Sequence, residues 1–161
     1  MIASNSILNR MTPSILLTAL GNKCIVELKR YLKTLNFDRQ KMEEVIVKFF
    51  NAFDKTGANG KHYKEFFSKM SDNEFKRYFT NFFDNEDAYL VLNIVDYERS
   101  ISLDDIERAA KVIGVPLFEY VYLPHLTMDK KKVVVTKERV PVGYINIKRT
   151  QQTVDLYSLR F

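Results

Sequence analysis

The chain has 161 residues, of which 46% are hydrophobic, and it carries a formal net charge of +5. This is enough material for one folded domain with its own core, and it excludes a chain that is disordered by composition. No apolar run approaches the roughly 18 residues of a membrane span, and no basic-then-apolar leader opens the sequence, so neither a membrane protein nor a secreted one is predicted. The single cysteine, Cys24, cannot form an internal disulfide, which is compatible with a reducing cytoplasm.

The charge is distributed unevenly along the chain. Residues 1–33 carry a net +4 and residues 130–161 a net +6, whereas residues 34–129 carry a net −5. Basic ends are expected where a chain approaches nucleic-acid or nucleotide phosphates. The alternative for the triplet Lys130–Lys132 is a solvated turn.

Helical patterns occupy the first part of the chain. Thr12 and Pro13 are typical of an N-cap and a first helical position, and apolar residues follow at helical spacing to Leu32, with one break predicted at Gly21-Asn22. Asp38 is expected to cap a second helix. Its apolar stripe consists of Met42, Val45, Ile46, Phe49, Phe50 and Phe53.

The middle of the chain alternates loops, helices and one strand. Residues 56–60 are predicted to form a flexible loop, followed by a helix over about 61–69. A further helix is expected from Ser71, where Glu74 completes a capping box. Residues 88–95 are rich in β-branched and apolar side chains and predict a strand.

The last helix is expected to begin at a cap formed by Ser102 and Asp105 and to end at Gly114. Strands are predicted at 117–123, 133–136 and 142–147, the last two joined by a turn at 137–139. The predicted fold class is therefore α+β, with a mainly helical region over 1–116 and a strand-rich region over 117–161, together forming one structural unit.

Several groups of residues resemble parts of known types of functional site. Asp54, Thr56 and Glu65 occupy positions one, three and twelve of a calcium-binding loop, but Ala58 and Asn59 remove a ligand and the required glycine, so no calcium site is predicted.

His62 and His125 lack a second histidine or a cysteine nearby, which argues against a zinc site. Cys24 lies within an apolar helical stripe and is interpreted as a core residue. The carboxylates of Asp104, Asp105 and Glu107 crowd a helix start, where compensation of the helix dipole explains them without catalysis.

Two motifs near the chain ends carry a family resemblance. Residues 6–17 read SILNRMTPSILL, and residues 140–148 read VPVGYINIK. In this order they resemble two landmarks in the C-terminal half of the β subunit of multisubunit RNA polymerases, which read approximately S-R-M-N-x-G-Q-I-L-E and P-V-T-V-G-Y-x-Y-M-L-K-L. The first motif keeps the Arg-Met pair, while Pro13 and Ser14 replace a variable residue and a glycine. The second keeps Pro141, Val142, Gly143 and Tyr144, and Gln152 stands where the family often has histidine.

Two further segments between these motifs fit the same resemblance. Residues 71–75, SDNEF, are similar to the S-D-E-E-[VI] opening of a family helix, and residues 101–106, ISLDDI, fit the next short helix. The four landmarks occur in the family order and cover most of the chain. The resemblance thus implies a fragment of the polymerase β-subunit fold, such as a separately encoded piece of a split β subunit from a large phage.

The resemblance also implies function, site residues and partners. The chain would be a component of a DNA-directed RNA polymerase, a nucleotidyltransferase, without being catalytic alone. Arg10 would contact the phosphates of the incoming nucleotide, and Lys148, Arg149 and Arg160 would face nucleic acid or a partner subunit. No cofactor is expected on this chain, because the family holds its magnesium ions on an aspartate motif of the β′ subunit. The expected partners are β-like and β′-like subunits, the DNA/RNA hybrid and nucleoside triphosphates, in the cytoplasm of a phage-infected bacterial host or in a virion.

Two other classes of protein remain open at this point. One is a non-catalytic phage virion or transcription-regulating module derived from the β fold. The other is an unrelated helical protein in which the motif order is a coincidence, and this would be favoured if the two ends of the chain lay far apart. In those cases Arg10 would be an exposed arginine before a helix, and Lys148, Arg149 and Arg160 would be basic residues flanking a final strand.

Overall fold

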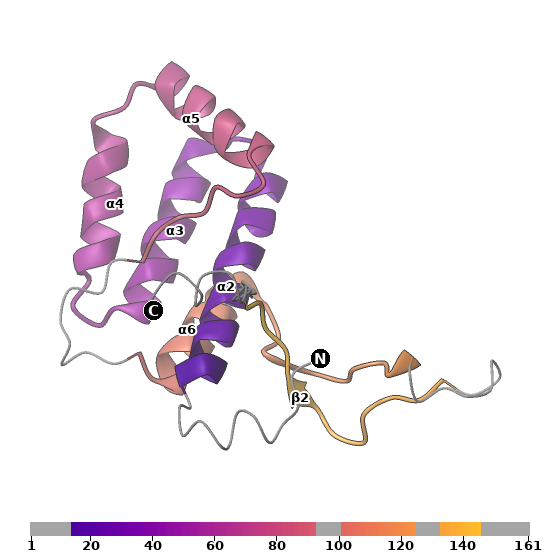
Figure 1. Cartoon of the computed structure of the whole chain (residues 1–161). Helices are drawn as coiled ribbons and strands as arrows, with labels where there is room; N and C mark the ends of the chain where they lie inside the picture. Colours follow the sequence, from indigo (N-terminus) through magenta and orange to yellow (C-terminus); the bar gives the residue numbers. More distant parts are fainter. Residues whose placement is uncertain (1–13, 93–100, 125–132, 146–161) are drawn as a thin grey trace, which may run out of the picture.

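The computed structural model describes residues 14–92, 101–124 and 133–145. Five helices and a two-stranded antiparallel sheet lie within these residues (Figure 1). The helices are α2 (Ser14–Thr34), α3 (Arg39–Phe53), α4 (Ala58–Ser68), α5 (Asp72–Asp84) and α6 (Leu103–Ile113), and the strands are β1 (Phe118–Glu119) and β2 (Val140–Pro141). The fold is thus mostly helical with a small sheet, which confirms the α+β class. None of the helices within the described residues is long and apolar enough to cross a membrane.

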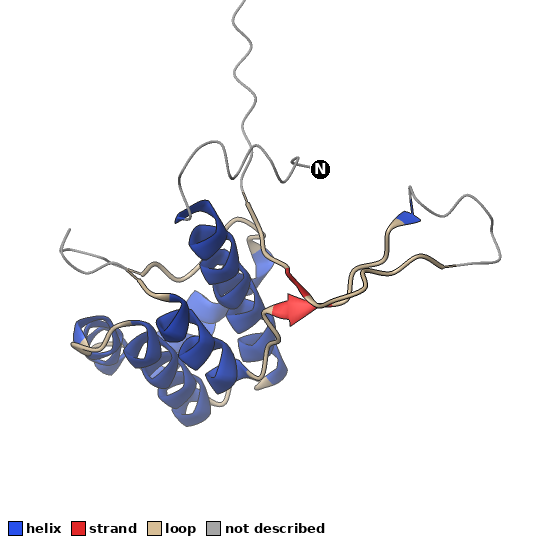
Figure 2. Ribbon diagram, turned by 90° about the horizontal axis from the view of Figure 1, so that it is seen from below, coloured by secondary structure: helices blue, strands red, loops and turns tan. Residues whose placement is uncertain are grey.

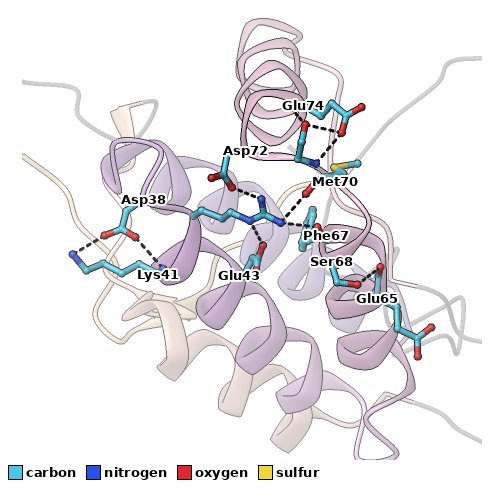
Figure 3. Close-up of polar contacts among 11 residues, drawn as sticks. Asp38, Lys41, Glu43, Glu65, Phe67, Ser68, Met70, Asp72 and Glu74 are labelled. Carbon is cyan, nitrogen blue, oxygen red and sulfur yellow. Dashed lines mark hydrogen bonds and ion pairs between the residues drawn. The ribbon is translucent and has the colours of Figure 1, made fainter.

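Three helices, α3, α5 and α6, begin where the capping signals predicted, whereas the cap predicted at Thr12 and Pro13 lies outside the described residues. The Asp38 side chain accepts a hydrogen bond from the Lys41 backbone N–H at the start of α3 (Figure 3). Ser71 with Glu74, and Ser102 with Asp105, form complete capping boxes at the starts of α5 and α6. These side chains satisfy backbone donors that a helix start otherwise leaves unpaired, so each helix has a defined first residue.

The core combines aromatic side chains from α3, α4 and α5 with aliphatic side chains, many of them from α2 and α6. The predicted stripe of α3 is confirmed, with five of its members buried and Val45 packed against them. α3 packs against α4 and α6, and α2 packs against α6. The largest fully buried side chains are Phe49, Phe50, Phe67, Phe75, Phe79, Leu28, Leu32, Met42, Ile46, Ile106 and Cys24.

Two predictions about helix continuity are wrong. α2 runs without interruption through Gly21 and Asn22. A glycine inside a helix costs only about 1 kcal/mol, which the burial of six side chains along this helix outweighs. The flexible loop predicted at 56–60 is shorter, because α4 already begins at Ala58.

The strand predicted at 88–95 is also wrong for its described part, since residues 88–92 form no strand. This segment is held by side chains instead of a neighbouring strand. The Tyr63 hydroxyl accepts a hydrogen bond from the Val91 N–H at 2.8 Å and lies 2.7 Å from the Val91 carbonyl oxygen, to which it donates. Lys29 donates to the Ala88 carbonyl, and Leu90 is buried in the core. The segment is thus fixed by Leu90 and by hydrogen bonds to side chains, without a partner strand.

The strand-rich region pairs differently from the prediction. The expected hairpin between 133–136 and 142–147 does not form in its described part. Instead, residues 117–123 run antiparallel to residues 134–142. We call this pair of segments the ribbon, and Figure 2 shows it projecting from the helices.

The register of the ribbon changes along its length. Phe118 lies opposite Pro141, whereas Tyr122 lies opposite Val135, so the second strand contains two extra residues between these pairs. The residues predicted as a turn, 137–139, form this irregular insertion. They lack the glycine or asparagine that a tight hairpin turn favours, so the chain bends there without reversing.

Candidate functional site

The C-terminal segment 142–145 lies against the first half of α2, and we call this contact the junction. The Tyr144 backbone N–H donates a hydrogen bond to the Ala19 carbonyl oxygen at 3.1 Å. A Cβ atom added to Gly143 would lie 2.4 Å from that same oxygen. Because backbone atoms are on both sides of this contact, only glycine allows the segment to approach the helix so closely.

Polar side chains of α2 complete the junction. Asn22 donates from its side-chain amide to the Tyr144 carbonyl oxygen at 3.1 Å. The Arg30 guanidinium lies 3.5 Å from the Tyr144 hydroxyl oxygen and also pairs with Glu27. Both the backbone and the side chain of Tyr144 are therefore held by the same helix.

A buried lysine connects α2 to the base of the ribbon. Lys23 is only 5% exposed. Its ammonium group donates to the Pro116 carbonyl oxygen at 2.7 Å and forms an ion pair with Glu119. A buried charge is tolerated only when it is paired and hydrogen-bonded, so this lysine constrains where the ribbon leaves the helices.

The four residues predicted to act on substrate, nucleic acid or a partner lie outside the described residues. They are Arg10, Lys148, Arg149 and Arg160. The structure does describe the inner part of each motif: residues 14–17 open α2, and residues 140–145 reach the same helix (Figure 1). The described part of the second motif thus contacts the helix that begins in the first motif, at residues Ala19, Asn22 and Arg30 beyond that motif.

Sequence reasoning missed the α2 residues that hold the second motif and the base of the ribbon. Ala19 and Lys23 belong to the predicted helix and its basic charge, and Asn22 to the predicted helix break, but none of the three was predicted as a contact. The one available signal was the pairing of small residues, since a glycine in the second motif and an alanine on the helix permit close backbone contact.

The calcium-like loop is closed by its own hydrogen bonds. The Asp54 carboxylate accepts from the backbone N–H and hydroxyl of Thr56 and from the backbone N–H and side-chain amide of Asn59. Partial burial alone would raise the pKa of Asp54, but these hydrogen bonds outweigh it and lower the pKa to about 2. Asp54 acts as a cap for the start of α4, where Gly57 has a positive φ of 70° and no side chain to offer.

The other apparent sites have structural roles. Cys24 is fully buried, and desolvation raises the pKa of its thiol to about 11, which confirms it as a core residue. Asp105 is held by the Ser102 cap and by Arg108. Across the described parts of the chain, no group of three or more His, Cys, Asp or Glu side chains could hold a metal ion.

A second cationic centre, absent from the sequence analysis, is Arg39. Its Nε donates to Glu43 at 2.8 Å, and its Nη2 donates to the Phe67 and Met70 carbonyl oxygens at 2.8 and 3.0 Å. It also pairs with Asp72 (Figure 3). Since its donors are shared among four protein oxygens, this guanidinium joins α3 to the α4–α5 connection and is not offered to a ligand.

Comparison of this chain with protein-family models, with curated proteins and with solved structures found no match.

Proposed function

We propose that the chain is a β-like component of a multisubunit DNA-directed RNA polymerase. There it helps to build the surroundings of the active centre and binds nucleotide or nucleic-acid phosphates, in the cytoplasm of a phage-infected bacterial host. The proposal rests on four sequence landmarks that occur in the order of the β subunit. The observation that carries it furthest is the junction, where the second landmark meets the helix that begins within the first.

The junction supports the proposal because the second landmark contacts the helix that continues the first, which a coincidental motif need not do. The glycine of the Val142-Gly143-Tyr144 sequence is the residue that the close contact with Ala19 requires. Tyr144 is then held through its N–H, its carbonyl and its hydroxyl. The residues that carry the resemblance thus also hold the segment 142–145 against α2, which supports the proposal.

Arg10 is the residue to which we assign substrate contact. Guanidinium stays charged at all working pH values and presents a planar set of donors that matches phosphate oxygens. Such a group stabilises the negative charge that moves to pyrophosphate during nucleotide addition. The net +4 charge of residues 1–33 favours the approach of a polyanion to the same part of the chain.

The remaining chemistry is assigned to partner subunits. The magnesium ions used in phosphoryl transfer would be held by the β′-like partner, and this chain contributes positive charge around them. Lys148, Arg149 and Arg160 are proposed to face the DNA/RNA hybrid or a neighbouring subunit, in a segment with a net +6 charge.

Co-purification tests the assembly directly. A tagged full-length chain, expressed in its native host, should recover large partners with β-like and β′-like sequences, identified by mass spectrometry. A chain recovered alone from transcriptionally active extract would contradict the proposal.

Substitution of Arg10 tests the role of the site within that assembly. Arg10→Ala should leave assembly intact, raise the apparent KM for nucleotides and slow nucleotide addition. Loss of one charged phosphate contact corresponds to about 1.5–3 kcal/mol, or roughly ten- to a hundred-fold in kcat/KM. Arg10→Lys should recover only part, because the charge remains but the bidentate donor set is lost.

Arg77→Ala is the matched control, because Arg77 is an exposed arginine on α5. It should transcribe at the wild-type rate under limiting nucleotide. If Arg10→Ala does so as well, the assignment of Arg10 is wrong even when the partners are those of a polymerase.

A further inference from the structure

The ribbon has one face whose aromatic side chains are exposed. Exposed and half-buried residues alternate along both of its strands, as expected when successive side chains point to opposite faces. Phe118, Tyr120 and Tyr122 occupy the outer face, with exposed fractions of 38%, 59% and 49%. Val133 and Val135 from the opposite strand are also exposed, and Val135 lies directly across from Tyr122.

The opposite face fixes the ribbon to the helices at its base. Leu117 is buried in the core, and Glu119 pairs with Lys23 of α2. Further along, the Val121 N–H donates to the Thr136 hydroxyl, and the Thr136 N–H donates to the Val121 carbonyl. These contacts hold the ribbon in one orientation, so the aromatic side chains of its outer face are presented together.

Within the described residues this outer face is not buried, because Phe118, Tyr120 and Tyr122 are all exposed. Two strands alone bury little apolar surface, and a contiguous exposed apolar patch commonly marks an interaction site. Three aromatic residues exposed on one face of a strand lower the solubility of a small ribbon, so they are not expected there without a binding role.

An arginine on the same ribbon indicates the chemistry of the occupant. The Arg139 guanidinium lies over the Tyr120 ring, 5.7 Å from its centroid. Among the described residues no carboxylate pairs with Arg139, and a guanidinium that stacks on a ring through its plane can still donate to a phosphate group through its edge. The sequence of residues 130–161, most of whose basic residues lie outside the described part of the chain, carries a net +6 charge, which complements a polyanion.

The spacing of the rings also fits a nucleic-acid strand. Alternate residues of a strand are about 6.6–6.8 Å apart, since each residue advances about 3.3–3.4 Å. Stacked layers are about 3.4 Å apart along one nucleic-acid strand, so a gap of about 6.8 Å between neighbouring rings admits one base. Aromatic rings combined with basic residues are the usual means of binding single strands without sequence preference.

We propose that the outer face of the ribbon, formed by Phe118, Tyr120, Tyr122 and Arg139, is a binding surface for single-stranded nucleic acid. Bases stack on the tyrosine rings and Arg139 contacts the phosphate backbone. The inference stands on the ribbon alone and does not depend on the polymerase assignment.

Fluorescence anisotropy with the full chain tests this surface. The probes are fluorescein-labelled oligothymidylate and oligouridylate of about 15 nucleotides, within the site sizes of known single-strand binders, at about 50 mM salt. Tyr120→Leu and Tyr122→Leu should each raise Kd by about tenfold, since leucine keeps an apolar side chain but removes the stacking surface. Tyr120→Phe should bind like the wild type. Arg139→Ala should weaken binding and reduce its salt dependence.

Tyr31→Leu is the control, because Tyr31 is an exposed tyrosine on α2, away from the ribbon. It should leave Kd unchanged, and a duplex of the same length should bind more weakly than the single strands. Circular dichroism would establish that each variant is folded. The proposal is overturned if the Tyr120 and Tyr122 variants bind as tightly as the wild type, or if Tyr31→Leu weakens binding equally. If the Tyr120 and Tyr122 variants bind as tightly as the wild type, the outer face of the ribbon is assigned to a protein partner.

A negative result in the binding assay and a negative result in the polymerase assays are independent of each other. The first uses the isolated chain and the second uses the native assembly. A chain that binds single strands but is recovered without polymerase-like partners would support the ribbon surface and contradict the polymerase assignment. The reverse result would leave only the polymerase assignment standing.

Discussion

The helical body and the ribbon use aromatic side chains in opposite ways. In the body, Phe67 is fully buried and its ring contacts those of Tyr63, Phe75 and Phe79. On the ribbon, Tyr120 is 59% exposed and its described ring contact is with Arg139. The body is therefore stabilised by its own packing, whereas the ribbon presents its rings to the outside.

The two regions are joined by a small number of specific contacts. The Lys23–Glu119 ion pair holds the start of the ribbon, and the contact of Gly143 with Ala19 holds its end. Both contacts involve α2. Because few contacts join the two regions, we expect the stability of the helical body to be insensitive to substitutions in the ribbon. Single substitutions at the junction should release the C-terminal segment from α2.

Truncation of the central aromatic residue should have the largest effect. Phe67→Ala removes a side chain that is fully buried between α3 and α5, and it should lower the free energy of unfolding by about 3–5 kcal/mol. Urea denaturation followed by circular dichroism measures this loss.

The neighbouring residue provides the control for that change. Phe66 lies on the same helix but is 37% exposed. Phe66→Ala should cost about 1 kcal/mol or less. Equal losses in the two variants would mean that the body is not organised around a buried aromatic core.

The helix starts and the core were predictable because both depend on local sequence. A capping box needs only two side chains three residues apart, as in Ser71 with Glu74. An amphipathic stripe likewise repeats at the helical period, so the buried face of α3 could be identified before its partners were known.

The errors occurred where contacts distant in sequence decide the structure. Residues 88–92 are held by the Tyr63 hydroxyl and by the burial of Leu90, and no local pattern separates such a segment from a strand. The pairing of 117–123 with 134–142 depends on the ion pair at Glu119 and on the docking of Gly143. Proximity in sequence favoured the wrong hairpin.

The candidate site was predictable only in part. The sequence drew attention to the Pro141-Val142-Gly143-Tyr144 motif through its resemblance to a known family. It could not single out Ala19 as its contact, because a small residue permits a close backbone approach without specifying its partner. Lys23 resembled any surface lysine until its burial was seen.

Substitution of the junction glycine tests how loosely the C-terminal segment is attached. Gly143→Ala places a methyl group within 2.4 Å of the Ala19 carbonyl oxygen, so the segment must move away from α2. We expect a local loss of about 1–3 kcal/mol, typical of overpacking. Amide exchange at Tyr144, measured by NMR, should become about tenfold faster or more, while the urea midpoint of the helical body changes little.

A second glycine distinguishes steric conflict from the general effect of alanine. Gly21 lies inside α2, and a Cβ added there has no neighbour within 4 Å. Gly21→Ala should therefore stabilise the helix by about 0.5–1 kcal/mol. If Gly143→Ala leaves Tyr144 exchange unchanged, the junction is not the close contact described above.

The smallest expected effect concerns a polar contribution to the body, the Asp54 cap between α3 and α4. Hydrogen bonds to its carboxylate lower the pKa from the ordinary 3.8 to about 2. A carboxyl whose pKa is lower in the folded state stabilises the fold above its unfolded pKa, and this contribution is lost as the pH falls through the folded value. Asp54→Asn should thus cost about 1 kcal/mol at pH 7, as for the loss of a helix cap, with the deficit shrinking between about pH 4 and pH 2. Urea denaturation of the wild type and of Asp54→Asn across this pH range measures the difference in their free energies of unfolding. The other carboxylates with lowered pKa values contribute equally to both proteins, so their contributions cancel; they are Asp38, Glu74 and Asp105. A deficit that stays constant down to pH 2 would show that the charge of Asp54 contributes nothing, and that aromatic packing alone holds this end of the body.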